Sequence, residues 1–185
     1  GENLLTISRN EIAKKIAYLS QGKNIPDMTV EQMVLHGRFP YLSYPRRYSS
    51  HDREVAIKAM EIVGVAEFAH KPLYSLSGGM RQNAYIAMAL AQDTDYILLD
   101  EPTTYLDIAH QLELMRILRK LADSGKGIVA VMHNLPIAFD FSDKLTVMSN
   151  GKIIAYGTPS EICESHIVED IFGVKIKQVQ KGKYL

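Results

Sequence analysis

The sequence predicts an α/β protein: a largely parallel sheet covered by helices, with a helical segment inserted after its first strand. Short apolar runs at 16–19, 96–99 and 128–132 have the length and continuous apolar character of buried strands. An amphipathic helical pattern separates the second run from the third, which is the order expected for parallel strands. The stretch at 21–76, between the first two runs, has a mostly helical pattern.

Local signals place the starts of several helices along the chain. Three Ser/Thr-x-x-Glu/Gln patterns predict capping boxes, in which each side chain bonds the backbone of the other residue. They pair Ser8 with Glu11, Thr29 with Gln32 and Thr158 with Glu161. Ser49 or Ser50 is expected to begin a further helix that ends at Gly64. Its predicted apolar stripe consists of Val55, Ala59, Ile62 and Val63.

The carboxyl half continues with an amphipathic helix at 108–124 and a hairpin. The predicted apolar face of the helix consists of Ile108, Leu112, Met115, Leu118 and Ala122. Strands at 144–148 and 153–156 flank Asn150-Gly151, a dipeptide typical of two-residue hairpin turns. The capping box at Thr158 then predicts one more helix.

Charge balance and cysteine content restrict the class of function. Among 185 residues, 21 are Lys or Arg and 21 are Asp or Glu, so the net charge is zero and a nucleic-acid partner is not expected. The single cysteine, Cys163, is expected to be buried and inert in a reducing compartment. No apolar run is long enough to span a bilayer, so any membrane role is expected to come through a partner.

Two carboxylates follow the apolar strand at 96–99. Asp100 and Glu101 stand at its carboxyl end, where ligands bind in open α/β sheets. Such an aspartate can hold Mg²⁺, and a neighbouring carboxylate can orient or deprotonate a water molecule. The alternative, about equally weighted from these residues alone, is a strand that ends in two solvated acids.

A Leu-Ser-Gly-Gly-Met segment at 76–80 precedes a helical run. Ser77 is a candidate N-cap, and the two glycines allow close backbone approach. Free amides and the helix dipole at such a start attract an anion. In isolation, an ordinary Gly-Gly turn before a helix is the more common explanation.

Taken together, five segments resemble the motifs of ATP-binding cassette (ABC) ATPases. The resemblance pairs 17–21 with the Q-loop, 76–79 with the signature, 96–102 with the Walker B strand, 103–107 with the D-loop and 131–133 with the H-loop. Their order and spacing cover nearly the whole chain. The resemblance implies a P-loop NTPase-type ABC ATPase core with an inserted helical subdomain.

The resemblance also implies roles for the polar residues of a site that binds ATP and Mg²⁺. Asp100 would hold Mg²⁺, and Glu101 would act as general base or polarise the attacking water. His133 would contact the γ-phosphate as a switch. Gln21 would contact Mg²⁺ or the water and couple the site to the transport partner. A polar turn residue is the alternative for Gln21, and a histidine at a strand end is the alternative for His133.

The family works as a head-to-tail dimer with two ATP molecules between the subunits. The signature of one subunit would bind the γ-phosphate of the nucleotide held by the other, which here involves Leu76, Ser77, Gly78, Gly79 and Met80. Asp107 would reach across the dimer and also serve as N-cap of the following helix. Met80 replaces the usual Gln and Asn83 a frequent Arg, which puts some polar contacts of the signature in doubt.

No Gly-Lys pair of the sequence is followed by Ser or Thr, so the P-loop motif is absent. The pairs at 22–23, 125–126, 151–152 and 182–183 all fail. The family's P-loop lies upstream of the Q-loop, and the chain begins without a methionine, so amino-terminal truncation is expected. Alone, these residues are expected to bind ATP poorly and to hydrolyse none, with exposed sheet edges.

A Val-Leu-His-Gly-Arg-Phe-Pro-Tyr stretch at 34–41 is similar to one in ATPases that import ferric siderophores, haem and cobalamin. This implies an importer of iron(III)-siderophore or a related metal chelate, at the cytoplasmic face of the membrane. Transmembrane permease subunits would be direct partners and a substrate-binding protein an indirect one. The aromatic loop at 39–48 would suit permease docking, with an exposed loop without a partner as its alternative.

Two other functions stay open from the sequence. A soluble ABC ATPase acting on DNA or ribosomes is disfavoured by the short insert and the neutral charge, and a non-catalytic fragment is the second. The expected division has four parts: 1–21 as the core remnant ending in the Q-loop, 22–76 as the helical subdomain, 77–160 as the catalytic core and 161–185 as carboxyl-terminal helices and tail.

Overall fold

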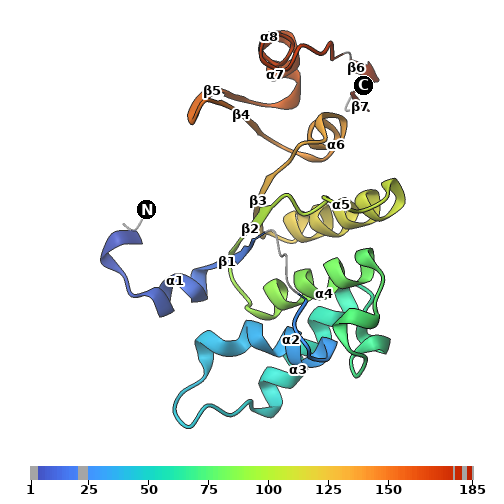
Figure 1. Cartoon of the computed structure of the whole chain (residues 1–185). Helices are drawn as coiled ribbons and strands as arrows, with labels where there is room; N and C mark the ends of the chain where they lie inside the picture. Colours follow the sequence, from blue (N-terminus) through green and yellow to red (C-terminus); the bar gives the residue numbers. More distant parts are fainter. Residues whose placement is uncertain (1–3, 21–24, 177, 181–182, 185) are drawn as a thin grey trace. The chain divides into compact units, whose positions relative to one another are not determined.

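Figure 1 shows the computed structural model of the chain, which describes residues 4–20, 25–176, 178–180 and 183–184. The fold divides into two compact units, residues 1–131 and 132–185. The predicted four-part division is finer than this and stays a prediction. Within the described residues, no helix combines the length and the apolar composition needed to cross a bilayer.

The first unit contains three strands and a helical segment. Its elements are η1 (Leu4–Thr6), α1 (Arg9–Lys15), β1 (Ile16–Leu19), α2 (Val30–Leu35), η2 (His36–Tyr41), α3 (Ser50–Ile62), η3 (Ala66–Phe68), η4 (Leu73–Ser75), α4 (Gly78–Ala91), β2 (Tyr96–Asp100), α5 (Ile108–Asp123) and β3 (Gly127–Val131). The η elements are 3-10 helices.

The sheet is parallel, in the order β1-β2-β3, as predicted. Ile97 of the middle strand pairs with Ala17 on one side and Ile128 on the other. The face that carries Ala17 and Ile97 is buried, with Leu19 and Leu99 on the same side. The opposite face is exposed, and it carries Tyr18, Tyr96, Val129 and Val131.

The helical segment packs α2, α3 and α4 against one another (Figure 1). A buried ion pair links these elements: Arg38 Nε lies 2.9 Å from Asp52 Oδ1, and Arg38 Nη1 donates to the carbonyl of Ala91 at 3.0 Å. Ser49, rather than Ser50, caps α3 and forms a capping box with Asp52. These contacts position α4, the helix that begins with the two glycines.

The predicted helix starts are confirmed, but two predicted apolar stripes are partly wrong. The capping boxes at Ser8, Thr29 and Thr158 form as expected. In α3, Ile62 is 54% exposed; the buried residues are Asp52, Ala56, Ala59 and Met60. In α5, Ile108 is 74% exposed; the buried residues are Leu114, Met115, Leu118 and Leu121. The rest of each stripe agrees in part, because Ala59 and Val63 of the first and Met115 and Leu118 of the second are buried as expected.

The second unit contains α6 (Leu135–Phe141), β4 (Leu145–Ser149), β5 (Lys152–Gly157), α7 (Pro159–Glu164), α8 (Ile167–Phe172), β6 (Gln178–Gln180) and β7 (Lys183–Tyr184). The predicted β4-β5 hairpin forms, and Asn150 and Gly151 both adopt positive φ as its turn requires. A small core consists of Phe139, Val147, Ile162 and Val168. Cys163, expected to be buried, is half-buried against that core.

Candidate functional site

The acidic pair stands at the carboxyl end of β2, in the middle of the sheet. Asp100 is the last residue of the strand and Glu101 follows it, both half-buried. The Glu101 amide donates to the carbonyl of Val131 at 3.1 Å, which extends the pairing with β3 beyond the strand. Parallel pairing thus holds the backbone of Glu101 in place where the sheet ends.

Glu101 adopts a left-handed backbone conformation, with φ of 49°. Such a conformation costs a non-glycine residue on the order of 1 kcal/mol and is concentrated at functional sites. The Thr104 hydroxyl donates to Glu101 Oε2 at 3.0 Å, and the Thr104 amide donates to the Glu101 carbonyl at 3.2 Å. Thr104 therefore orients a carboxylate that the turn has directed away from the strand.

The segment after the turn leads directly into α5. Asp107 caps this helix, as expected, because its Oδ1 accepts from the His110 amide at 2.9 Å. Its Oδ2 lies 2.7 Å from His110 Nδ1. The Gln111 side chain donates to the carbonyls of Leu106 and Thr103, at 2.9 and 3.3 Å. The first turn of α5 thus holds the predicted D-loop from both ends.

The hydrogen bonds to Asp107 have an electrostatic consequence. The His110 backbone bond, followed by the bond to the His110 side chain, lowers the pKa of the Asp107 carboxyl below its ordinary value. Asp107 is therefore ionised at neutral pH and acts only as an acceptor. Tyr105 in the same segment is 93% exposed and has φ of 64°.

The Ser-Gly-Gly segment begins α4 as the sequence predicts. Ser77 is the N-cap, and its hydroxyl accepts from the Met80 amide at 3.3 Å. The other amides of a first helical turn have no partner within the helix and can bind an anion. A Cβ added at Gly78 would meet no atom within 4 Å, so this glycine borders open space.

Some of the residues around the two glycines have structural roles. Leu76 is 7% exposed, so the exposed portion of this segment begins at Ser77. Asn83, which stands where the family often has Arg, donates to the carbonyl of Val63 at 3.0 Å. This bond links α4 to the end of α3 and gives the substitution a structural role.

Two predicted site residues lie outside this arrangement. Gln21 falls outside the described residues, and its role stays a prediction. His133 lies in the second unit, two residues beyond the end of β3 and just before Asn134, the N-cap of α6. The structure therefore brings together Asp100 and Glu101 with Thr104, and Asp107 with the start of α4 through His110.

The donor set at the strand end fits Mg²⁺ shared with a phosphate. No group of three His, Cys, Asp or Glu side chains with metal-site geometry occurs among the described residues. Mg²⁺ does not need such a cage, because it keeps several waters and is held by one or two carboxylates plus substrate phosphates. Asp100, half-buried at the carboxyl end of a parallel strand, has the chemistry and location for this purpose.

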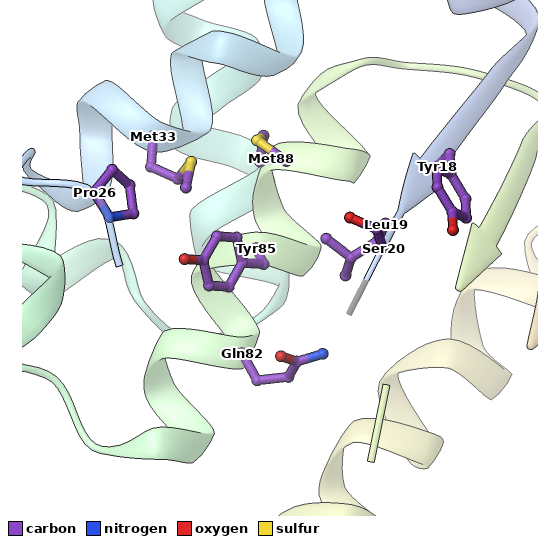
Figure 2. A pocket seen from close by; sticks show the side chains of 8 residues that line it. All are labelled: Tyr18, Leu19, Ser20, Pro26, Met33, Gln82, Tyr85 and Met88. Carbon is purple, nitrogen blue, oxygen red and sulfur yellow. The ribbon is translucent and has the colours of Figure 1, made fainter. Parts of the chain in front are cut away.

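A separate cavity of about 310 Å³ lies between the end of β1 and the helical segment. Figure 2 shows Tyr85 and Met88 of α4 and Met33 of α2 on one side, and Tyr18, Leu19 and Ser20 on the other. Pro26 and Gln82 complete the lining. Burial raises the pKa of the Tyr85 phenol, so it stays protonated and neutral at physiological pH. Flexible methionines are typical of surfaces that adapt to a partner.

Sequence reasoning missed two contacts that organise this site. Thr104 and His110 were not singled out, although one follows Glu101 by three residues and the other follows Asp107 by three. A side chain three residues along a tight turn or first helical turn faces back toward its start. The three-residue spacing could have predicted the bond between His110 and Asp107. The contact of His110 with α4 could not be predicted in this way, because it joins segments far apart in the sequence.

Comparison with known proteins finds relatives that align along nearly the whole chain. The petrobactin import ATP-binding protein FpuD of Bacillus anthracis is 41% identical over 174 residues, covering 93% of this chain and 64% of its own length. The ferric enterobactin transport ATP-binding protein FepC of Escherichia coli is 40% identical over 177 residues, covering 95% of this chain and 65% of its own length. The chain thus spans less than two thirds of these relatives.

A solved structure described as a metal-chelate type ABC transporter in an inward-facing conformation superposes with a TM-score of 0.82. The two sequences are 28% identical, and the match covers 92% of this chain and 70% of the chain in that structure. The predicted ABC ATPase fold is therefore confirmed. The sequence profile of the family described as ABC transporter matches residues 1–104, more than half of the sequence. With this match and relatives that align along nearly its full length, the chain belongs to the ABC transporter family.

Proposed function

We propose that the chain is part of an ATP-hydrolysing subunit that energises an ABC importer of an iron(III)-siderophore or a related metal chelate. The names of the relatives support the substrate class, because they concern petrobactin and ferric enterobactin. The observation that carries the reaction is Glu101, held in a left-handed turn at the end of β2 and oriented by Thr104. The P-loop would come from a further segment of the complete subunit, since the relatives are longer than this chain.

In the proposed reaction, the residues of this chain position the reactants and neutralise the charge of the phosphates, and none of them bonds covalently to the substrate. Asp100 would hold Mg²⁺, which supplies charge neutralisation to the phosphates when bound. Glu101 would accept a hydrogen bond from the attacking water and remove its proton as the water attacks the γ-phosphorus in line. The bond from that phosphorus to the bridging β-phosphate oxygen would break at the same time, and ADP would leave. Thr104 would keep the Glu101 carboxylate at the angle this step requires.

The start of α4 would serve the nucleotide of a second subunit. Its first-turn amides and helix dipole would stabilise the γ-phosphate oxygens as they gain charge. Gly78, which borders open space, would let those oxygens approach the backbone. This arrangement requires a head-to-tail dimer, in which the start of α4 of each subunit completes the nucleotide site at β2 of the other subunit.

The complete subunit would act at the cytoplasmic face of the membrane by docking on a permease. The aromatic segment around η2 supports this role: Phe39 is 44% exposed and Tyr44 is 97% exposed. Tyr41 is instead anchored, because its hydroxyl donates to the carbonyl of Gln92 at 3.0 Å and its ring lies 4.0 Å from Arg38. Phe39 and Tyr44 are therefore the side chains available to a permease helix.

The experiment is Glu101→Gln in the complete subunit with its permease. Loss of the base is expected to lower steady-state ATP turnover by at least about a hundredfold, while ATP affinity is retained. Glu113→Gln, on an exposed position of α5, is the matched control and should keep wild-type turnover. Unchanged turnover in Glu101→Gln would refute the role of Glu101, and a wild-type subunit without ATPase activity would refute the proposed function.

A further inference from the structure

The second glycine of the Ser-Gly-Gly segment is surrounded differently from the first. A Cβ built on Gly79 would overlap His110 Cδ2 and would lie 2.8 and 3.0 Å from Cγ and Nε2 of the same ring. Gly79 is buried, whereas Gly78 borders open space. The two glycines therefore have different surroundings: Gly78 borders open space, and Gly79 leaves room for the His110 imidazole of the same chain.

A hydrogen bond to Asp107 holds the imidazole beside Gly79. Its Nδ1 lies 2.7 Å from Asp107 Oδ2, and Asp107 also caps the helix that carries His110. Because the Asp107 carboxylate only accepts, the proton of this hydrogen bond resides on Nδ1. The opposite edge of the ring, with Cδ2 and Nε2, then faces Gly79.

The contact links two segments that would meet the same partner. Gly79, in the first turn of α4, and Asp107 are 28 residues apart in the chain, and His110 touches both. Gln111, one residue later, holds the carbonyls of Thr103 and Leu106. The first turn of α5 thus connects the two segments within one subunit.

We propose that His110 is a positioning residue: its imidazole, wedged between Gly79 and Asp107, holds the start of α4 and the predicted D-loop as one rigid surface for a second copy of the chain. The proposal rests on the proposed function, because that surface closes over the partner's nucleotide. The two segments then engage the partner together. Because they are already ordered relative to each other, dimerisation carries no further entropic cost for ordering each segment separately.

The first test measures ATP-driven dimerisation in the complete subunit carrying Glu101→Gln, where slow hydrolysis lets the dimer accumulate. Adding His110→Ala is expected to raise the ATP concentration for half-dimerisation roughly tenfold, the size of a typical site-to-site coupling. ATP affinity of the separate subunit should stay unchanged, because in the proposed arrangement His110 lies on the surface that faces the partner. His51→Ala, an exposed histidine of α3, is the matched control.

A conservative variant separates positioning from general loss of folding. In His110→Asn, the side-chain amide can occupy the place of Nδ1 and donate to Asp107, so dimerisation should recover most of its wild-type ATP dependence. A dimerisation defect that persists in His110→Asn and parallels a lowered Tm would overturn the proposal. Wild-type ATP dependence in His110→Ala would overturn it as well.

A double-mutant cycle tests the Gly79 contact itself. Gly79→Ala should weaken dimerisation, because the added methyl collides with the imidazole. In Gly79→Ala/His110→Ala the methyl enters vacated space, so the two effects should be clearly non-additive. Additive effects would overturn the proposal alone, whereas a wild-type subunit that neither dimerises with ATP nor hydrolyses it would overturn the proposed function and this proposal together.

Discussion

Single residues in this chain combine a local backbone role with a candidate chemical one. Glu101 ends the pairing of β2 with β3 and, through its left-handed turn, presents a carboxylate to Thr104. Asp107 caps α5 and holds His110. Each of these residues has both a structural and a candidate chemical role, so its substitution is expected to alter stability as well as function. Each functional test therefore needs a separate measurement of folding stability.

The buried Arg38–Asp52 pair makes stability depend on acid pH. Burial would raise the pKa of the Asp52 carboxyl, but hydrogen bonds from Ser49, the bond from Arg38 and its charge together lower it from 3.8 to about 2. The lowered pKa contributes about 2 kcal/mol of stability above pH 4. That contribution is lost as the pH falls from about 4 toward 2, where the folded-state carboxyl protonates.

Asp52→Asn tests this pH dependence by urea unfolding at pH 7 and pH 3. At pH 7 the variant should lose about 3 kcal/mol, because Arg38 stays buried without a charged partner. The gap to the wild type should narrow at pH 3, because the unfolded-state carboxyl is then mostly protonated and part of the stability gained from the lowered pKa is lost. Asp123→Asn, in an exposed pair with Arg119, is the control and should change stability by less than about 0.5 kcal/mol. A gap independent of pH would contradict the assignment.

At the scale of elements, helix starts do most of the positioning in this fold. α4 begins at the two glycines and α5 begins at Asp107, and the two starts touch through His110. A cap defines the first residue of a helix and the direction of its free amides. The candidate anion site and the segment beside it therefore depend on caps rather than on long side chains.

Asp107→Ala should destabilise α5 by about 1 kcal/mol, the usual cost of losing an N-cap side chain. The measurement is the urea midpoint at neutral pH. Asp95→Ala, at an exposed position before β2, provides the comparison and should leave the midpoint nearly unchanged. Equal midpoints for the two variants would mean that the Asp107 cap contributes nothing measurable to stability.

At the scale of the whole molecule, the sheet has one buried and one exposed face. Parallel sheets are normally covered on both faces, yet Tyr18 and Val129 are 60% and 58% exposed. In the 185-residue chain alone, the apolar face should promote self-association.

Val129→Lys should reduce this self-association, because a charge on the exposed face opposes its burial. Sedimentation of the purified chain at increasing concentration measures the effect. Ile62→Lys, on an exposed site of α3, adds the same charge elsewhere and serves as the control. A wild-type chain that stays monomeric at high concentration would show that this face does not drive association.

The sequence alone determined the features that rest on neighbouring residues: the capping boxes, the Asn150-Gly151 turn and the strand that ends at Asp100. Tertiary structure decided which side of α5 is buried, that His110 occupies the space beside Gly79, and which face of the sheet is exposed. The difference lies in how far apart in the sequence the interacting residues are. Caps and turns are satisfied within three or four residues, whereas the rotation of a helix and the neighbour of a glycine depend on contacts between segments far apart in the chain.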